Sequence, residues 1–225
     1  MKVVIKLGGA VFSPAPNIDL IKAYNSIFRK IHKEGHRVVV VTGGGARARD
    51  YIKMARDLGT DEGVCDQIGI EVSRLNATLM MSSLGEAAYP IVPRDMSEAR
   101  RALHCQKVLF MGGVTPGQST DAVAALMAEM VGADVFVRTL DVDGVYTDDP
   151  KRNKKAKRIE SITVEELAKL LVGGGILAGT YPLLDPIALK IIERSKVQTW
   201  FVNGRDPENL RKLFKGAPVG TKIRL

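Results

Sequence analysis

Short apolar runs alternate with amphipathic segments along the chain. Residues 2–7 (KVVIKL) and 37–42 (RVVVVT) are rich in Val and Ile, and glycines follow each run at once. This pattern is typical of buried parallel strands that run into tight turns. Between them, apolar residues recur at helical spacing over residues 21–31, after a candidate N-cap at Asn17 and before a stop at Gly35. The first 42 residues therefore predict a βαβ unit.

The same alternation continues to the end of the chain. The spacing of Ile68, Val72, Leu75 and Leu79 predicts a long helix with more apolar residues than one buried stripe needs. Further strands are predicted over residues 107–111, 134–137, 197–202 and 221–225, and further helices after residue 117 and over 163–171 and 185–195. This order indicates an α/β protein with a mainly parallel sheet. No repeat or disordered linker interrupts it, so we expect a single domain over residues 1–225.

Composition and charge narrow the classes of protein. With 225 residues and 45% hydrophobic content, the chain can bury a large core. No apolar stretch approaches the roughly 18 residues that a membrane helix needs, so we expect a cytoplasmic protein without a membrane partner. Cys65 and Cys105 lack the spacing of metal ligands, and we expect no metal site made of side chains. The net charge of +8 suits anionic partners, including nucleotides and nucleic acids, and residues 151–158 (KRNKKAKR) form the most basic segment.

Glycine turns follow three of the predicted strands, at Gly8-Gly9, at residues 43–45 and at Gly112-Gly113. Ligands of open α/β sheets bind beyond the carboxyl ends of the strands, where glycines let backbone N–H groups approach phosphate oxygens. One such turn alone can serve only to end a strand. Three turns favour a site for an extended anion, with about one phosphoryl group at each turn.

The third turn lacks the cation that such a site needs. Residues 111–129 have the glycine spacing of a P-loop, but Gln118 stands where a P-loop has Lys. Lys6, near the end of the first strand, can supply the charge from the other side of the crevice, since its burial requires an anionic partner. Arg47 and Arg49 can add positive charge, although a surface salt bridge is an alternative for each.

Six segments resemble successive motifs of a known family: KLGGAVF, VTGGGARARDY, CDQIGIEVSRLNA, GGVTPGQSTDAVAALMAE, DVDGVYTDDP and AGTYPLLDPIALKIIERS. Together they span nearly the whole chain and resemble the archaeal-type uridylate kinases of the amino acid kinase fold family. The glycine motifs are shared across that fold family, whereas the segment from Asp66 and PGQSTDA point to a UMP kinase. The resemblance implies a three-layer αβα sandwich with a mainly parallel central sheet. It also implies transfer of the ATP γ-phosphoryl group to UMP, giving UDP, in pyrimidine nucleotide biosynthesis.

The resemblance assigns residues to two nucleotide sites. Those that resemble the UMP site are Gly44, Asp66, Val114, Thr115, Pro116, Gly117, Gln118, Ser119 and Thr120. Asp66 would accept hydrogen bonds from both ribose hydroxyls, and the turn would meet the uracil edge. Those that resemble the ATP site are Gly9, Ala10, Gly45, Arg49, Leu140, Tyr146 and Asp149. Roughly, residues 1–110 would form the acceptor-side half, and residues 111–225 would complete the UMP site and carry the ATP side.

The chain departs from the family pattern on the ATP side. Leu140-Asp141 stands where Thr-Asn is usual, which leaves backbone contacts only at Leu140. Ala10 stands where Ser is common. Each change removes a hydroxyl group that would otherwise face ATP.

The expected mechanism needs no general base, because a UMP phosphate oxygen is already an anion. Catalysis then consists of aligning two polyanions and neutralising the charge between them. Lys6 and a Mg²⁺ ion carried by the nucleotide phosphates would neutralise that charge. The amides of Gly8, Gly9, Gly44 and Gly45 would hold the phosphates, and Arg49 would brace them. We expect Asp121 to cap its helix and to orient neighbouring residues. The resemblance further implies a homohexamer, built as a trimer of dimers, and UTP as a competitive inhibitor.

Two alternatives stay open. Another kinase of this fold, with a carboxylate, carbamate or isopentenyl phosphate acceptor, would share the glycine turns and Lys6 but would not need Asp66. A nucleic-acid-binding protein would explain the charge and the basic segment. However, aromatic residues make up only 5% of the chain and no stacking motif accompanies that segment. We therefore expect no nucleic-acid partner.

Overall fold

The structure is a computed structural model that describes residues 1–12, 15–150, 152–172 and 184–225. Within these ranges the main sheet has seven strands in the order β3-β2-β1-β4-β8-β9-β7. They are β1 (Lys2–Leu7), β2 (Arg37–Thr42), β3 (Leu109–Met111), β4 (Val135–Leu140), β7 (Ser161–Thr163), β8 (Gln198–Asn203) and β9 (Thr221–Arg224). Neighbouring strands are parallel except β8 and β9. A separate antiparallel pair consists of β5 (Val145–Tyr146) and β6 (Arg158–Ile159).

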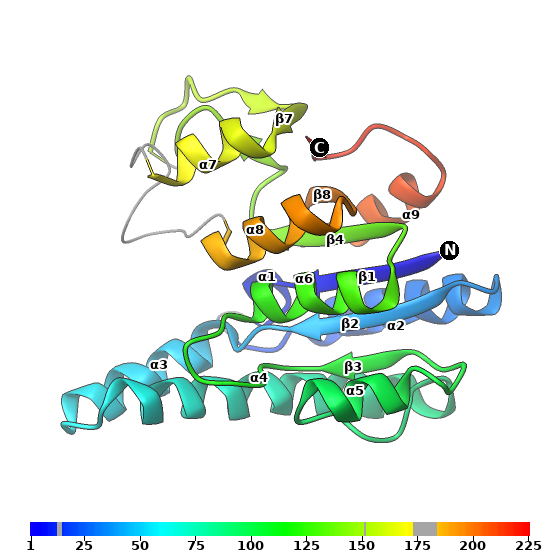
Figure 1. Cartoon of the computed structure of the whole chain (residues 1–225), viewed down its shortest axis with the longest axis vertical. Helices are drawn as coiled ribbons and strands as arrows, with labels where there is room; N and C mark the ends of the chain where they lie inside the picture. Colours follow the sequence, from blue (N-terminus) through cyan, green and yellow to red (C-terminus); the bar gives the residue numbers. More distant parts are fainter. Residues whose placement is uncertain (13–14, 151, 173–183) are drawn as a thin grey trace.

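Helices cover both faces of the main sheet (Figure 1). They are α1 (Gly9–Phe12), α2 (Ile18–Lys33), α3 (Gly45–Asp57), α4 (Glu62–Leu84), the short 3-10 helix η1 (Gly85–Ala87), α5 (Met96–Ala102), α6 (Thr120–Val131), α7 (Val164–Val172), α8 (Pro186–Ser195) and α9 (Glu208–Phe214). One buried cluster joins α1, α2, α4 and α9 to the sheet, and a second joins α5, α6, α7 and α8 to its other face. The predicted α/β fold with three layers and a mainly parallel sheet is confirmed.

The alternation of side chains along β1 determines which face of the sheet Lys6 lies on. Val3, Ile5 and Leu7 pack in the cluster of α2 and α4, whereas Val4 packs in the cluster of α6. Because successive side chains of a strand point to opposite faces, Lys6 lies on the face covered by α6. The strand thus carries a charged residue into the layer between the sheet and α6, near its carboxyl end.

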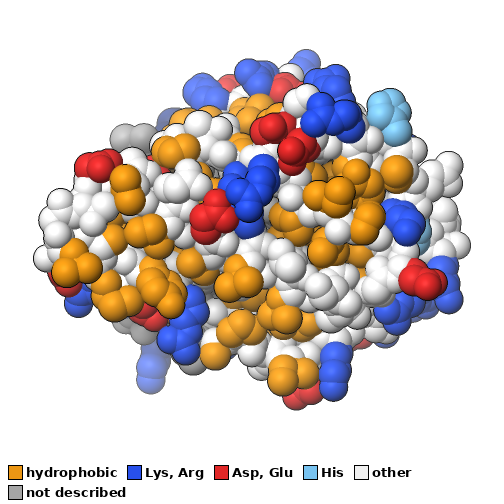
Figure 2. Space-filling model, turned by 90° about the horizontal axis from the view of Figure 1, so that it is seen from below, with side chains coloured by type: hydrophobic (Ala, Val, Ile, Leu, Met, Phe, Trp, Pro, Cys, Tyr) orange, Lys and Arg blue, Asp and Glu red, His pale blue; other side chains and the backbone are white. Residues whose placement is uncertain are grey.

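Helix α4 is longer than predicted, and its buried side is a different one. Its buried residues include Ile70, Ala77 and Met80, of which Ala77 and Met80 pack in the cluster against the sheet. Leu75 and Leu79, from the predicted stripe, are 67% and 40% exposed. The helix therefore has two apolar sides, one in the core and one on the surface. Figure 2 shows the molecule from below, where hydrophobic side chains gather on this surface.

The remaining differences concern ends of elements. Strand β3 starts later than predicted, because Val108 forms only an isolated bridge with Ala88. Strand β4 runs on to Leu140, three residues past its predicted end. Two sequence features fall partly outside the described residues, namely Lys151 of the basic segment and the first six residues of the motif at 178–195. None of the helices in the described ranges is both long and apolar enough to cross a membrane.

Candidate active site

A buried group of three charged side chains lies near the carboxyl ends of β1 and β4. We call Lys6, Asp121 and Arg138 the charge cluster. Lys6 Nζ lies 3.2 Å from Asp121 Oδ1. Arg138 donates from Nε to Oδ1 over 3.0 Å and from Nη2 to Oδ2 over 2.7 Å. Lys6 and Arg138 are partners in the parallel register of β1 and β4, and all three residues are less than 10% exposed. Asp121 is thus the anion that accompanies the buried lysine.

The expected role of Asp121 as a helix cap is wrong. The cap of α6 is Ser119, whose hydroxyl accepts a hydrogen bond from the N–H of Ala122 over 3.1 Å. The hydroxyl of Ser119 also contacts the carboxylate of Asp185, which caps α8. Since Ser119 satisfies the helix end, the carboxylate of Asp121 is left to turn toward β1 and β4.

Two features determine the pKa values in the charge cluster: its burial, and its excess of cations over anions. Burial by itself raises the pKa of Asp121, but the charges of Arg138 and Lys6 lower it to about 2. Burial lowers the pKa of the Lys6 ammonium, and Asp121 opposes this effect only in part. Two cations and one anion leave the cluster with an excess positive charge when all three are ionised. Such a site favours a further anion.

The second glycine turn lies against this cluster. A Cβ atom placed on Gly43 would be 3.5 Å from Lys6 Nζ and 3.5 Å from Thr120 Oγ1. Gly44 is the N-cap of α3 and offers no side-chain cap, and a Cβ there would come within 2.3 Å of Ala48 Cβ. Gly45 has a φ of 68°, in the left-handed region. The N–H groups of Gly44 and Gly45, at the start of α3, are therefore placed to bind an anion next to Lys6.

Two other glycine amides are already used within the protein. The N–H of Gly8 donates to Thr139 Oγ1 over 2.8 Å, and the N–H of Gly113 donates to Ser73 Oγ over 2.7 Å. A Cβ on Gly112 would lie 2.6 Å from the backbone nitrogen of Arg74. The prediction that the amide of Gly8 holds phosphate is wrong, because Thr139 accepts its hydrogen bond. Here the glycines permit close packing instead.

The acceptor turn, residues 114–120, lies beside α4. Asp66 Oδ2 accepts a hydrogen bond from the N–H of Gly117 over 2.7 Å, so the structure brings these two predicted residues together. Val114 and residues 118–120 are half-buried, whereas the tip at Thr115, Pro116 and Gly117 is exposed. The tip is closed by a hydrogen bond from the N–H of Gln118 to the carbonyl of Thr115 over 3.2 Å. An exposed tip with a carboxylate beside it suits a ribose and a base.

The residues predicted for ATP lie on several elements. Gly9 and Ala10 open α1, Tyr146 is in β5, and Asp149 follows it. Leu140 ends β4 and is buried, and its carbonyl accepts a hydrogen bond from the N–H of Gly204 over 2.7 Å. The carbonyl of Leu140 is thus already engaged. Asp149 lies in a turn, where its carbonyl accepts from the N–H groups of residues 152 and 153.

The two arginines of α3 differ. Arg47 Nη1 lies 3.9 Å from Asp50 Oδ2 in an exposed ion pair. Arg47 therefore forms the surface salt bridge that was the alternative to a role in binding phosphate. Arg49 is exposed and makes no ion pair with a described residue. Of the two, Arg49 is therefore the better donor for an incoming phosphate.

Several polar residues that shape the site were not predicted. Arg138 and Thr139 lie in β4, and their appearance in an apolar strand is a signal that the sequence offered. On α4, Asn76 donates from Nδ2 to the carbonyl of Gly43 over 2.8 Å. Ser73 Oγ accepts a hydrogen bond from the N–H of Gly113 in the third glycine turn. Both α4 residues are buried on the side opposite to the exposed apolar stripe. Helix α4 thus fixes two of the three glycine turns.

Comparisons with known proteins agree with this geometry. The model of the amino acid kinase family matches residues 1–203. A uridylate kinase of Methanoregula boonei is 47% identical over 208 residues, which are 92% of this chain and 88% of that protein. One of Methanocella arvoryzae is 45% identical over the full length of both chains. The crystal structure of uridylate kinase from Archaeoglobus fulgidus superposes with a TM-score of 0.89 at 42% identity and covers all of both chains. The chain belongs to the amino acid kinase family and, within it, to the archaeal-type uridylate kinases.

Proposed function

We propose that this protein transfers the γ-phosphoryl group of ATP to UMP, giving UDP, in pyrimidine nucleotide biosynthesis. The observation that carries the proposal is the buried ammonium of Lys6 beside Gly43, next to the start of α3, where the N-cap is Gly44 and has no side chain. The full-length similarity to uridylate kinases supports UMP as the acceptor. Acceptors such as carbamate or isopentenyl phosphate are not favoured.

In this mechanism the residues of the chain orient the two nucleotides and neutralise their phosphate charge. No side chain has to transfer a proton. The N–H groups of Gly44 and Gly45 bind phosphate oxygens, and Lys6 stabilises the negative charge that develops between donor and acceptor. Asp121 and Arg138 hold Lys6 in place. Arg49 braces the phosphates from the surface of α3.

A Mg²⁺ ion would supply further neutralisation of the phosphate charge. Among the described residues, no group of three or more His, Cys, Asp or Glu side chains could hold a metal ion. Asp121, the carboxylate nearest to Lys6, is engaged by two cations. The described residues therefore suit a Mg²⁺ ion that is bound mainly by the nucleotide phosphates.

Residue roles for the two nucleotides follow the sequence expectations. Asp66 accepts from the ribose hydroxyls of UMP, and the acceptor turn reads the uracil edge. Tyr146 and Asp149 flank the adenosine, and Gly9 and Ala10 lie along the ATP phosphates. The chain acts as one domain, with the acceptor side in roughly residues 1–110. UTP competes with UMP, because it presents the same uridine.

We further propose a cytoplasmic homohexamer built as a trimer of dimers, without a nucleic-acid partner. The exposed apolar side of α4, with Val64, Leu75 and Leu79, and the neighbouring Tyr51 and Met54 of α3 support burial against a second copy. Tyr51 and Val64 line a shallow hollow on this surface. Apolar exposure of this kind is typical of an interface.

One coupled assay tests the acceptor. UMP, CMP, AMP and isopentenyl phosphate are each offered with Mg-ATP, and release of ADP is followed. We expect UMP to give the highest kcat/KM by a wide margin. Equal rates with UMP and CMP would show that the acceptor turn does not read the base, and a preference for isopentenyl phosphate would remove the proposed function.

A further inference from the structure

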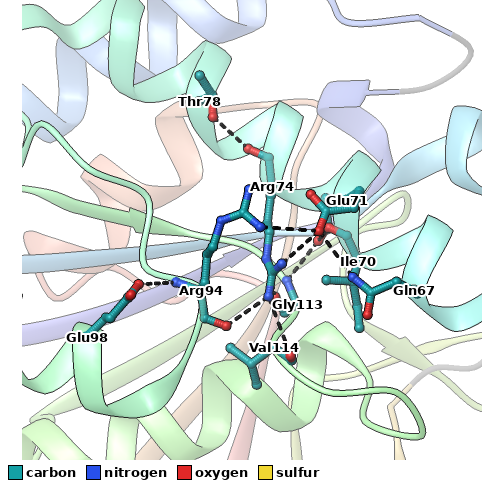
Figure 3. Close-up of polar contacts among 10 residues, drawn as sticks. Gln67, Ile70, Glu71, Arg74, Thr78, Arg94, Glu98, Gly113 and Val114 are labelled. Carbon is teal, nitrogen blue, oxygen red and sulfur yellow. Dashed lines mark hydrogen bonds and ion pairs between the residues drawn. The ribbon is translucent and has the colours of Figure 1, made fainter.

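Helix α4 reaches the stem of the acceptor turn through a buried arginine (Figure 3). Arg74 is 9% exposed. Its Nε donates to the carbonyl of Gly113 over 3.0 Å, and its Nη2 reaches the carbonyl of Val114 at 3.4 Å. Asp66, two helical turns earlier, binds the tip of the same turn through the N–H of Gly117. The turn is thus held at its stem by Arg74 and at its tip by Asp66.

The stem has little freedom to move away from α4. Both polar backbone groups of Gly113 are used by adjacent α4 residues, its N–H by Ser73 and its carbonyl by Arg74. A Cβ on Gly113 would lie 2.9 Å from Ile70 Cγ1, so the close approach depends on glycine. In a turn without strand partners, these contacts satisfy backbone groups that would otherwise be buried without hydrogen bonds.

The guanidinium of Arg74 is itself fixed. Its Nη1 donates to Glu71 Oε1 over 2.9 Å, and its Nη2 donates to the carbonyl of Arg94 over 2.8 Å. Glu71 Oε1 also accepts from Gln67 Nε2 over 3.1 Å. A planar fork with donors in fixed directions can serve these partners at once, whereas a lysine ammonium on a flexible stem cannot. Arg74 thus makes more hydrogen bonds than an ion pair on a helix surface provides.

We propose that Arg74 is a positioning residue for the acceptor nucleotide. Arg74 touches no nucleotide in this scheme. By holding the carbonyls of Gly113 and Val114 against α4, it sets the backbone of residues 113–119 in the conformation that receives UMP. The proposal rests on the proposed function, which places UMP at this turn. The new element is that the affinity for UMP depends on the hydrogen bonds between Arg74 and the backbone of the turn, outside the nucleotide site itself.

Arg74→Lys tests the proposal on the full-length enzyme. The substitution keeps the positive charge and removes the fork. We expect KM for UMP to rise about tenfold, as for the loss of one or two charge-assisted hydrogen bonds, with kcat at saturating UMP and KM for ATP changed by less than about threefold. Thermal stabilisation by UMP should weaken while that by ATP persists. The matched control is Arg101→Lys on α5, since Arg101 is exposed and its guanidinium donates to Ser97 Oγ, one turn away, as its one hydrogen bond among the described residues.

The outcomes separate positioning from a structural role. A lower melting temperature with an unchanged KM for UMP, or an equal rise in both KM values, overturns the proposal. If Arg74→Lys does not fold, Glu71→Gln replaces it, because it weakens one support of the fork and keeps the turn contacts. It should raise KM for UMP by about twofold to threefold, and no change overturns the proposal. A parent enzyme that fails to phosphorylate UMP in the same assay would instead refute the proposed function.

Discussion

Asp121 should be the most costly carboxylate to neutralise among the described residues. It is buried, holds Lys6 at 3.2 Å and binds Arg138 through two hydrogen bonds. Asp121→Asn keeps the size of the side chain and removes its charge. Two buried cations then face each other without a counter-charge. Removing one partner of a buried ion pair typically costs roughly 3–5 kcal/mol, and we expect a loss in this range at pH 7.

The pH dependence gives a second estimate of the same interaction. The pKa of Asp121 in the folded protein is about 2, against 3.8 for an ordinary aspartate. At about 1.4 kcal/mol for each pKa unit, the difference corresponds to roughly 2 kcal/mol. Because the folded-state pKa is the lower one, this stabilisation is complete above pH 3.8. It is lost as the pH falls from there to about 2.

Urea unfolding of the parent and of Asp121→Asn, at pH 7 and at steps down to about pH 2, measures both quantities at one protein concentration. The parent should lose stability below pH 4 more steeply than the variant. Glu62→Gln is the matched control. Glu62 pairs with Arg56 at the surface, where solvent screens the charges and such a pair contributes little to stability. A loss below about 1 kcal/mol for Asp121→Asn, with parallel acid profiles, would refute the account of the charge cluster.

Three further predictions concern the reaction and the assembly. Lys6→Ala should lower kcat by about a hundredfold or more, with both KM values changed by less than about tenfold, and Lys6→Arg should rescue poorly. A normal kcat with a raised KM for ATP would make Lys6 a binding residue. The parent should prefer UMP over dUMP by about tenfold to a hundredfold in kcat/KM, and Asp66→Asn should narrow that gap; an unchanged gap means that another residue reads the ribose. Light scattering should give the mass of a hexamer, and Leu75→Glu should reduce that mass, whereas a monomeric parent would contradict the proposed interface.

The order of strands and helices could be predicted from the sequence because it depends on short-range periodicity. Val and Ile runs and helical spacing are local signals, and the glycines after β1 and β2 indicate where those strands end. The side of α4 that is buried could not be predicted. That helix carries one apolar stripe for the core and another, with Leu75, for the surface, and only tertiary packing distinguishes them.

Which glycine amides are available to a ligand could not be predicted either. The acceptors of the Gly8 and Gly113 amides are Thr139 and Ser73, which lie 131 and 40 residues away in the chain. The cap of α6 was ambiguous for a local reason. Ser119 and Asp121 are both capping residue types within three positions, and choosing between them requires the position of β1.

The two cations of the charge cluster cannot exchange roles. Arg138 aligns its planar fork with both oxygens of Asp121, which fixes the carboxylate. Lys6 makes one described contact, with one oxygen of Asp121, although an ammonium has three N–H donors. Its Nζ also faces Gly43 beside the start of α3. In the proposed mechanism, a phosphoryl group that enters there would take the remaining donors of Lys6 without breaking the pair of Arg138 and Asp121. Lys6 would then act on the substrate, while Arg138 and Asp121 hold its ammonium in place.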